Sequence, residues 1–335
     1  MAGAAAGRDP GRDGSARLQA FKGPRLHCDQ RIGTRVRRGG RGADDGDEPL
    51  SENLHPRADE IDDLSALEFV ALMHAEDVAA LNAITPRLED VARAVEAVTE
   101  RLSSGGRLHY FGAGTSGLIA ELDAAECPAT FGVAGDRVLA HSVEDTQEDD
   151  RDLGGETARR AAIGSGDVVV GISASGRTPF VLGAFERAAV DGPLRIAVTC
   201  KPGSPLGQAA DIAIEVDKGP EVIAGSTRLK AGTVQKVILN MLSTAVFTRL
   251  AHTHRGRMVG VVASNEKQRG RAAGVVADLG AASREEAVGA LEAARGNVKV
   301  AIVMLRRGLN PDEARLRLDA AGGDLKVVLA EARRP

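Results

Sequence analysis

The first regular pattern of apolar and polar residues predicts two helices. Apolar residues recur at helical spacing in "LSENLHPRADEIDDLSALEFVALMHAEDVAALNAI", at Leu64, Leu67, Val70, Leu72 and Met73. "LEDVARAVEAVTERLSSGG" is a second amphipathic stretch, and Gly105-Gly106 is a typical helix end. We therefore expect the patterned part of the chain to open with two helices.

From about residue 106 the pattern alternates between short apolar runs and helical stretches. The apolar runs are "RLHYFGAG", "DVVVGIS", "LRIAVTC" and "DIAIEV", and helical stretches such as "ETARRAAIG" and "PFVLGAFERAAV" lie between them. Short β-branched runs separated by helices indicate parallel strands joined by crossovers. The predicted fold class is α/β, a doubly wound parallel sheet flanked by helices.

Two further segments complete the predicted organisation. "LKAGTVQKVILNMLSTAVFTRLAHTH" predicts a long apolar helix, packed in the core or against a partner subunit. After residue 280 the pattern predicts three short helices, with Ser283 and Asn310-Pro311 as start signals. The expected parts are a basic arm over residues 1–48, the α/β domain over 49–275 and a small three-helix domain over 281–332.

Composition narrows the possible partners. Apolar residues make up 43% of the chain, but no run reaches the 18 that a membrane helix needs. Aromatic residues make up 2%, too few for base-stacking platforms, so no nucleic-acid partner is expected. Cys28, Cys127 and Cys200 show neither metal-ligand spacing nor a disulfide framework, and a reducing cytoplasm fits best.

The net charge of −4 conceals an asymmetry between the arm and the remainder. Residues 1–42 contain ten Lys or Arg and three Asp, a charge of +7, so the remainder carries −11. The arm is rich in Gly and Ala and lacks periodicity, which predicts disorder or an over-extended start. A nucleic-acid tail or a transit peptide is the functional alternative.

Two loops have the composition of an anion site. Residues 114–117 follow the first predicted strand and include Thr115 and Ser116. Residues 173–178 follow the second, with candidate ligands Ser173, Ser175, Arg177 and Thr178. Glycine permits close backbone approach, hydroxyls donate hydrogen bonds, and each loop precedes a helix whose free N–H groups favour an anion. Two such loops at the carboxyl edge of one sheet favour a phosphosugar site.

A dinucleotide site is the alternative interpretation of the first loop. Gly112, Gly114 and Gly117 satisfy G-x-G-x-x-G, and Asp136 or Glu144 lies near the distance expected for a ribose-binding acid. That interpretation leaves the second serine-rich loop unexplained.

Residues 219–236 form a third polar cluster. Glu221 precedes a turn, Ser226 and Thr227 are possible phosphate contacts, and Lys230 or Lys236 is a possible counter-charge. The alternative is an ordinary helix start with Ser226 or Thr227 as N-cap.

Carboxylates supply the remaining candidates. Glu126 precedes Cys127-Pro128, where proline predicts a helix break that could turn the acid into a cleft. In "VEDTQEDDRD", by default a hydrated loop, Glu144 and Glu148 are the acids that could reach a substrate. His252 and His254 have the spacing of a metal pair but no evident third ligand, so a helix-end pair is preferred. Cys127 lacks a clear base partner and is interpreted as a small buried residue.

Several long motifs in order carry a family resemblance. The strings "GAGTSG…DAAECPATFG", "VVVGISASGRTPFVLGA", "GPEVIAGSTRLKAGTVQKVILNMLST" and "MVGVVASNEKQRGRA" closely resemble the N-acetylmuramic acid 6-phosphate etherases, bacterial members of the sugar isomerase (SIS) family. The resemblance runs from about residue 50 to the C-terminus and leaves the basic arm outside it.

The resemblance implies an activity and roles for particular residues. These enzymes cleave the D-lactyl ether of N-acetylmuramic acid 6-phosphate, giving N-acetylglucosamine 6-phosphate and D-lactate in cell-wall sugar recycling. By resemblance, Glu126 matches the acid that protonates the departing lactate. Glu148 with Asp149 is the preferred match to the second glutamate, and Glu144 is the alternative. Ser116, Ser175 and Thr178 become phosphate or sugar ligands, with Ser226 and Thr227 as helpers.

The same resemblance implies a homodimer with a site near the subunit interface. Elimination of this kind needs positioned acid and base groups, and no metal or other cofactor is expected. The segment between Phe131 and Glu144 looks shorter than is usual in the family, which leaves the position of the second glutamate open. The competing functions are an aldose–ketose phosphosugar isomerase and a non-catalytic sugar-phosphate-sensing regulator of the same fold.

Overall fold

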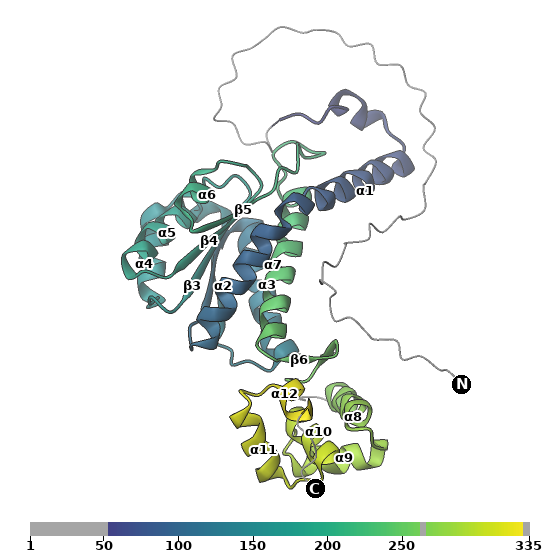
Figure 1. Cartoon of the computed structure of the whole chain (residues 1–335). Helices are drawn as coiled ribbons and strands as arrows, with labels where there is room; N and C mark the ends of the chain where they lie inside the picture. Colours follow the sequence, from purple (N-terminus) through teal and green to yellow (C-terminus); the bar gives the residue numbers. More distant parts are fainter. Residues whose placement is uncertain (1–52, 262–265, 331–335) are drawn as a thin grey trace, which may run out of the picture. The chain divides into compact units, whose positions relative to one another are not determined.

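The computed structural model describes residues 53–261 and 266–330 (Figure 1). The predicted basic arm lies outside these residues, as does Cys28. Within the described part, no helix is both long enough and apolar enough to cross a membrane.

A five-stranded parallel sheet confirms the predicted fold class. Its strand order is β2-β1-β3-β4-β5, and the strands are β1 (Leu108–Ala113), β2 (Val138–Val143), β3 (Val168–Ser173), β4 (Leu194–Thr199) and β5 (Ile212–Glu215). The chain leaves β1 for β2 on one side and then crosses to β3 on the other. This reversal is the position where such sheets bind ligands, beyond the carboxyl ends of β1 and β3.

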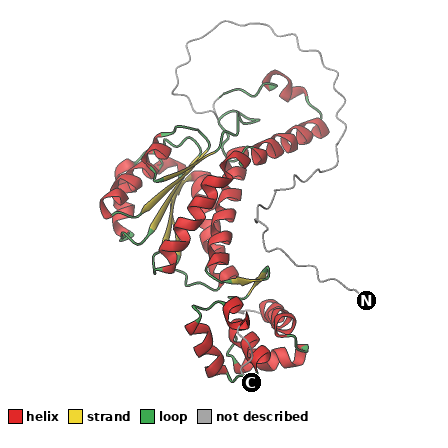
Figure 2. Ribbon diagram, in the orientation of Figure 1, coloured by secondary structure: helices red, strands yellow, loops and turns green. Residues whose placement is uncertain are grey.

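The central strands are buried on both faces because helices cover both sides of the sheet (Figure 2). Along β3, Val168 and Val170 belong to the apolar cluster with α2 (Leu88–Ser103), α3 (Gly114–Phe131) and α7 (Lys230–Arg249). Val169 belongs to the cluster on the opposite face, formed with helices α4 (Arg151–Arg160), α5 (Pro179–Asp191) and α6 (Pro205–Ala209). The period-two alternation of strand side chains thus divides the core into two layers.

The first predicted helix is present as α1 (Ala66–Asn82), preceded by the 3-10 helix η2 (Ala58–Asp63). A capping box fixes its start: the Ser65 hydroxyl accepts from the Glu68 amide, and the Glu68 carboxylate accepts from the Ser65 amide. Short 3-10 turns η3 (Thr85–Arg87) and η4 (Asp145–Gln147) precede α2 and α4.

The predicted helix break at Pro128 is wrong. Helix α3 continues to Phe131 and ends at Gly132, whose left-handed backbone has a φ of 67°. Pro128 lies in the last turn, so its missing N–H removes only one helical bond, and its own carbonyl accepts from the Gly132 amide at 2.9 Å. Glu126 therefore lies on a regular helix rather than at a bend.

The described residues after 280 form four helices where three were predicted. Ser283 and Asn310 are confirmed as capping-box starts, and the helices are α9 (Arg284–Ala293), α10 (Val298–Arg307), α11 (Pro311–Ala320) and α12 (Leu325–Ala330). The prediction missed the start at Asn297, whose side chain accepts from the Val300 amide. Together with α8 (Glu266–Gly280) these helices form a separate apolar cluster. A small hairpin of β6 (Thr253–His254) and β7 (Arg257–Met258) precedes α8.

Candidate active site

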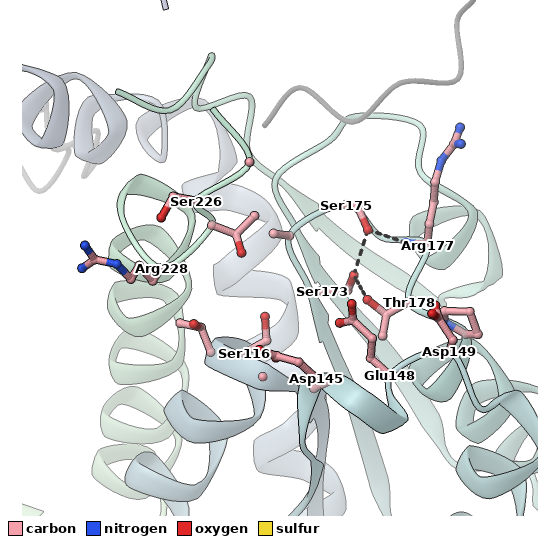
Figure 3. A pocket seen from close by; sticks show the side chains of 17 residues that line it. Ser116, Asp145, Glu148, Asp149, Ser173, Ser175, Arg177, Thr178, Ser226 and Arg228 are labelled. Atoms are coloured by element: carbon pink, nitrogen blue, oxygen red, sulfur yellow. Dashed lines mark hydrogen bonds between the residues drawn. The ribbon is translucent and has the colours of Figure 1, made fainter. Parts of the chain in front are cut away.

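A polar hollow of about 490 Å³ lies at the carboxyl ends of β1 and β3. Four segments line it (Figure 3): residues 113–116, the acids of residues 145–149, residues 173–179 and residues 225–228. The hollow thus occupies the position expected from the strand order. Both loops predicted as an anion site contribute to it, and the third polar cluster contributes in part.

The first wall is a helix start rather than a free loop. Helix α3 begins at Gly114, directly after β1, so Thr115 and Ser116 lie in its first turn. Gly114 has a φ of +50°, and a Cβ atom there would lie 2.0 Å from the Asp145 Oδ1 atom. The left-handed backbone favours glycine, and a larger residue would displace the Asp145 carboxylate. The first-turn amides of α3 have no helical acceptors, and they begin at the edge of the hollow.

Ser116 is held by a residue that the sequence analysis did not single out. Its Oγ atom donates to the Oε1 atom of Gln235 on α7 at 3.0 Å, and both side chains are buried. The bond joins positions 119 residues apart. No local pattern marks such a pair.

The second wall gathers hydroxyl groups at the start of α5. Ser173 Oγ lies 2.8 Å from Thr178 Oγ1 and 3.4 Å from Ser175 Oγ (Figure 3). It also accepts from the Gly176 amide at 3.0 Å. Thr178 is the N-cap position of α5 and makes no side-chain capping bond. These hydroxyls are donors suited to a phosphate group, and they lie at the amino-terminal end of the 13-residue helix α5, where the helix dipole favours an anion. Arg177 also lines the hollow.

The acidic wall places one carboxyl group beside the hydroxyls. The backbone carbonyl of Glu148 accepts from the Phe180 amide at 2.9 Å, which ties this segment to the first turn of α5. Burial, and then the negative charges of Asp145 and Asp149, raise the pKa of Glu148 above its ordinary value. A carboxyl group with a raised pKa is suited to exchange protons with a substrate. Glu144, the alternative, does not line the hollow.

The third wall, in addition to the acidic wall and those at the starts of α3 and α5, is the loop before α7. Ser226 and Thr227 line the hollow, as does Arg228, which the sequence analysis did not single out. The N-cap residue of α7 is Leu229, so the alternative that Ser226 or Thr227 caps this helix is wrong.

Glu221 and Lys230 lie beneath this loop rather than in the hollow. The fully buried Glu221 carboxylate accepts from the amides of Lys230 and Ala231 at 2.9 and 3.0 Å, and Lys218 Nζ lies 3.1 Å from it. Lys230 Nζ donates to Glu76 on α1 at 2.6 Å. Both residues, predicted as substrate ligands, do not line the hollow and lie next to the loop that carries Ser226, Thr227 and Arg228.

The comparisons with known proteins agree with this architecture. The model of the SIS domain matches residues 152–245. An N-acetylmuramic acid 6-phosphate etherase from Rubrobacter xylanophilus is 45% identical over 297 residues, which cover 86% of this chain and 98% of that protein. This chain belongs to the N-acetylmuramic acid 6-phosphate etherase family.

Other family members are similarly related to it. The etherase from Cutibacterium acnes is 42% identical over 290 residues, covering 84% of this chain and 95% of that protein. Among solved structures, a phosphoheptose isomerase from Neisseria gonorrhoeae aligns with a TM-score of 0.43 and 23% identity, over 55% of this chain and 100% of that one.

The etherase resemblance assigns catalytic roles to Glu126 and Glu148, and these two glutamates do not line the same hollow within one chain. Glu126 does not line the hollow; its side chain is 62% exposed and lies 3.6 Å from Lys236 Nζ. Ser116 and Glu126 are ten positions apart on α3, so their Cα atoms lie roughly 15 Å apart at about 1.5 Å per residue.

The other candidate residues, Cys127 and His252, have the surroundings of residues that stabilise the fold. Cys127 is buried, and burial raises the pKa of its thiol to about 12. His252 Nδ1 lies 2.7 Å from the carbonyl oxygen of Phe131. In residues 53–261 and 266–330, no group of three or more His, Cys, Asp or Glu is arranged to hold a metal ion. The acids required by the dinucleotide alternative, Asp136 and Glu144, do not line the hollow.

Proposed function

We propose that this chain cleaves the D-lactyl ether of N-acetylmuramic acid 6-phosphate and releases N-acetylglucosamine 6-phosphate and D-lactate. Its relatives at 41–45% identity carry the name of that etherase. The observation that carries the proposal is the position of Glu148, a carboxyl group of raised pKa next to a hydroxyl-lined helix start.

The substrate phosphate binds at the start of α5. Three helix starts surround or adjoin the hollow, but the Glu221 carboxylate already occupies that of α7, and the Asp145 carboxylate lies against that of α3. At α5 the Ser173, Ser175 and Thr178 hydroxyls are donors at the positive end of the helix dipole, and no carboxylate of the described residues is bonded to this helix start.

The reaction is an elimination followed by hydration. Opening of the pyranose ring gives an aldehyde that acidifies the C2 proton, and Glu148 removes this proton. The bond between C3 and the lactyl oxygen then breaks, and Glu126, supplied by the second copy of the chain in a homodimer, donates the proton that the departing lactate takes. Water adds at C3 of the resulting double bond, and the proton returns to C2. The class is therefore a carbon–oxygen lyase.

We place this reaction in the cytoplasm, in amino sugar metabolism and the recycling of peptidoglycan. The proposed assembly is a homodimer. Exposed large apolar side chains on α1 and α3 support it, since exposed apolar patches are typical of interaction surfaces. They are Leu67, Val70, Val78 and Leu81 on α1 and Leu118 and Leu122 on α3.

An assay of D-lactate tests the proposal. Purified protein is incubated with N-acetylmuramic acid 6-phosphate, and D-lactate is measured with a coupled dehydrogenase. N-acetylglucosamine 6-phosphate, which lacks the ether, is the control substrate. In ¹⁸O-labelled water the etherase adds one labelled oxygen at C3. Failure to release lactate refutes the proposal, and a ketose product from the control substrate identifies an isomerase instead.

A further inference from the structure

Two glycines lie inside the helices on either side of the acidic wall. Gly154 is the fourth residue of α4 and Gly183 is the fifth residue of α5, and both are buried. Glycine inside a helix is less favourable than alanine because it loses more conformational freedom on folding. A contact too close for a side chain would account for glycine at both positions.

The two glycines form a reciprocal contact between the backbones of α4 and α5, which pack on one face of the sheet (Figure 1). A Cβ atom at Gly154 would lie 1.9 Å from the carbonyl oxygen of Phe180. A Cβ atom at Gly183 would lie 2.0 Å from the carbonyl oxygen of Arg151. Both oxygens belong to helix backbones, which cannot turn aside as the end of a long side chain can. Each glycine therefore permits a helix separation that alanine does not.

The same contact holds Glu148 against the start of α5. The Glu148 carbonyl accepts from the Phe180 amide at 2.9 Å, and the Phe180 carbonyl lies against Gly154. Asp150, the N-cap residue of α4, follows Glu148 by two positions, and its side chain accepts from the Leu153 amide at 2.8 Å. A shift of α4 therefore also moves Glu148.

Helix α5 is held more firmly than α4. Phe180, Val181 and Phe185 of α5 are fully buried in the apolar cluster on this face of the sheet. The buried residues of α4 are Gly154 and Ala158, which have little or no side chain. Because the free energy of burial rises with the apolar area removed from water, an added methyl group should displace α4 rather than α5. The hydroxyls at the start of α5 should then stay in place.

We propose that Gly154 and Gly183 are positioning residues, because the contact that they permit sets the distance between the Glu148 carboxyl group and the hydroxyls that bind the phosphate. The inference rests on the proposed etherase function. The phosphate and the C2 proton belong to one substrate molecule, so the base has to lie at a matching distance from the phosphate position. A displacement of about 1 Å is enough to lower a rate by about 10²-fold.

The variants Gly154→Ala and Gly155→Ala test the inference as a matched pair. They make the same chemical change at adjacent positions of α4, but a Cβ atom at Gly155 would lie 3.6 Å from its nearest neighbour, the carbonyl oxygen of Gly183, which is an ordinary contact. We expect Gly154→Ala to lower kcat for lactate release by about 10²-fold and Gly155→Ala to keep the wild-type value. A folded Gly154→Ala protein with wild-type kcat overturns the inference.

Binding measurements separate positioning from a general loss of structure. Since the hydroxyls on α5 stay in place, Gly154→Ala should bind N-acetylglucosamine 6-phosphate with the wild-type Kd and the wild-type number of sites by isothermal titration. Its KM should likewise change little while kcat falls. A loss of kcat matched by an equal loss of binding sites would indicate unfolded protein and would also overturn the inference.

The variant Gly183→Ala inserts the methyl group from the opposite helix, and it provides the test if Gly154→Ala does not fold. Its methyl group meets the Arg151 carbonyl on α4, so kcat should fall to a similar extent. Both changes act through one displacement, so the double variant should lose less than the product of the two single losses. Multiplied losses would contradict a shared displacement. A wild type that releases no lactate refutes the proposed function instead.

Discussion

At the scale of single residues, Glu148 is an acid of the hollow whose surroundings differ from those of a surface acid. It is half-buried between Asp145, Asp149 and the start of α5. Burial and the two neighbouring negative charges destabilise its ionised form. We expect Glu148→Gln to lower kcat by about 10²–10⁴-fold because it removes the base, while phosphosugar binding persists. Lactate assays and isothermal titration measure the two effects.

The matched control for this change is Glu144→Gln. Glu144 lies four residues earlier in the same acidic segment but does not line the hollow, so its variant should keep wild-type kcat. Loss of activity in the Glu144 variant alone would show that the other alignment of the acidic motif is correct.

A second prediction at this scale concerns His109 and His141, which bridge β1 and β2. His109 Nδ1 lies 3.0 Å from His141 Nε2, the rings stack, and burial lowers the pKa of each to about 4. Between about pH 4 and the ordinary value near 6.5, the unfolded chain therefore binds more protons than the folded chain. The contribution of these two histidines to the free energy of unfolding should therefore be complete above this window and should fall as the pH drops through it.

The variant His141→Gln removes one of these titrating groups. Its free energy of unfolding, measured by urea denaturation at several pH values, should depend less steeply on pH between about 6.5 and 4 than that of wild type. An unchanged slope would contradict this assignment.

At the scale of elements, the start of α7 depends on a carboxylate from an earlier position in the chain. Glu221 bonds two first-turn amides and pairs with the buried Lys218, so it closes the loop that carries Ser226, Thr227 and Arg228. Glu221→Gln leaves a buried ammonium group unpaired and should lower the free energy of unfolding by about 3–5 kcal/mol. It should also raise KM, because the third wall loosens.

The double variant Glu221→Gln/Lys218→Met tests the cause. It removes the unpaired charge, so thermal unfolding should show partial recovery of stability relative to Glu221→Gln. No recovery would mean that the loss comes from the capping bonds alone.

The predictability of the elements followed from burial. Strands β1, β3 and β4 were found because two-sided burial gives continuous apolar runs, whereas the edge strand β2 was missed because His141 and Ser142 interrupt its pattern. The hydroxyl groups at the start of α5 were also predicted from local sequence, because they lie together in one short loop between a strand and a helix. Gln235 was not, because only tertiary packing brings this residue of α7 to Ser116, which lies 119 positions away in the chain.

The roles of two predicted residues could not be predicted from local sequence. Glu221 and Lys230 have the composition of ligands, but their partners, Lys218 and Glu76, are known only from the fold. The prediction of a helix break at Pro128 was wrong because a proline in the last turn of a helix removes only one backbone hydrogen bond.

At the scale of the whole molecule, the charge is divided unevenly, and the basic arm lies outside both the described residues and the family resemblance. We propose that it is separable from the folded part. A chain that lacks residues 1–45 should keep the wild-type Tm and lactate-release rate, measured by calorimetry and the coupled assay. A large loss of either would show that the arm takes part in folding or catalysis.

The arrangement of helix starts around the hollow has a consequence for inhibitor chemistry. With the Glu221 carboxylate at α7 and the Asp145 carboxylate at α3, the hollow offers one open anion position, at α5, facing a group of three acids. A second phosphate on a ligand would thus be repelled rather than bound. The complementary molecule is a zwitterion, with a dianion for the hydroxyls of α5 and an ammonium group for Asp145, Glu148 and Asp149.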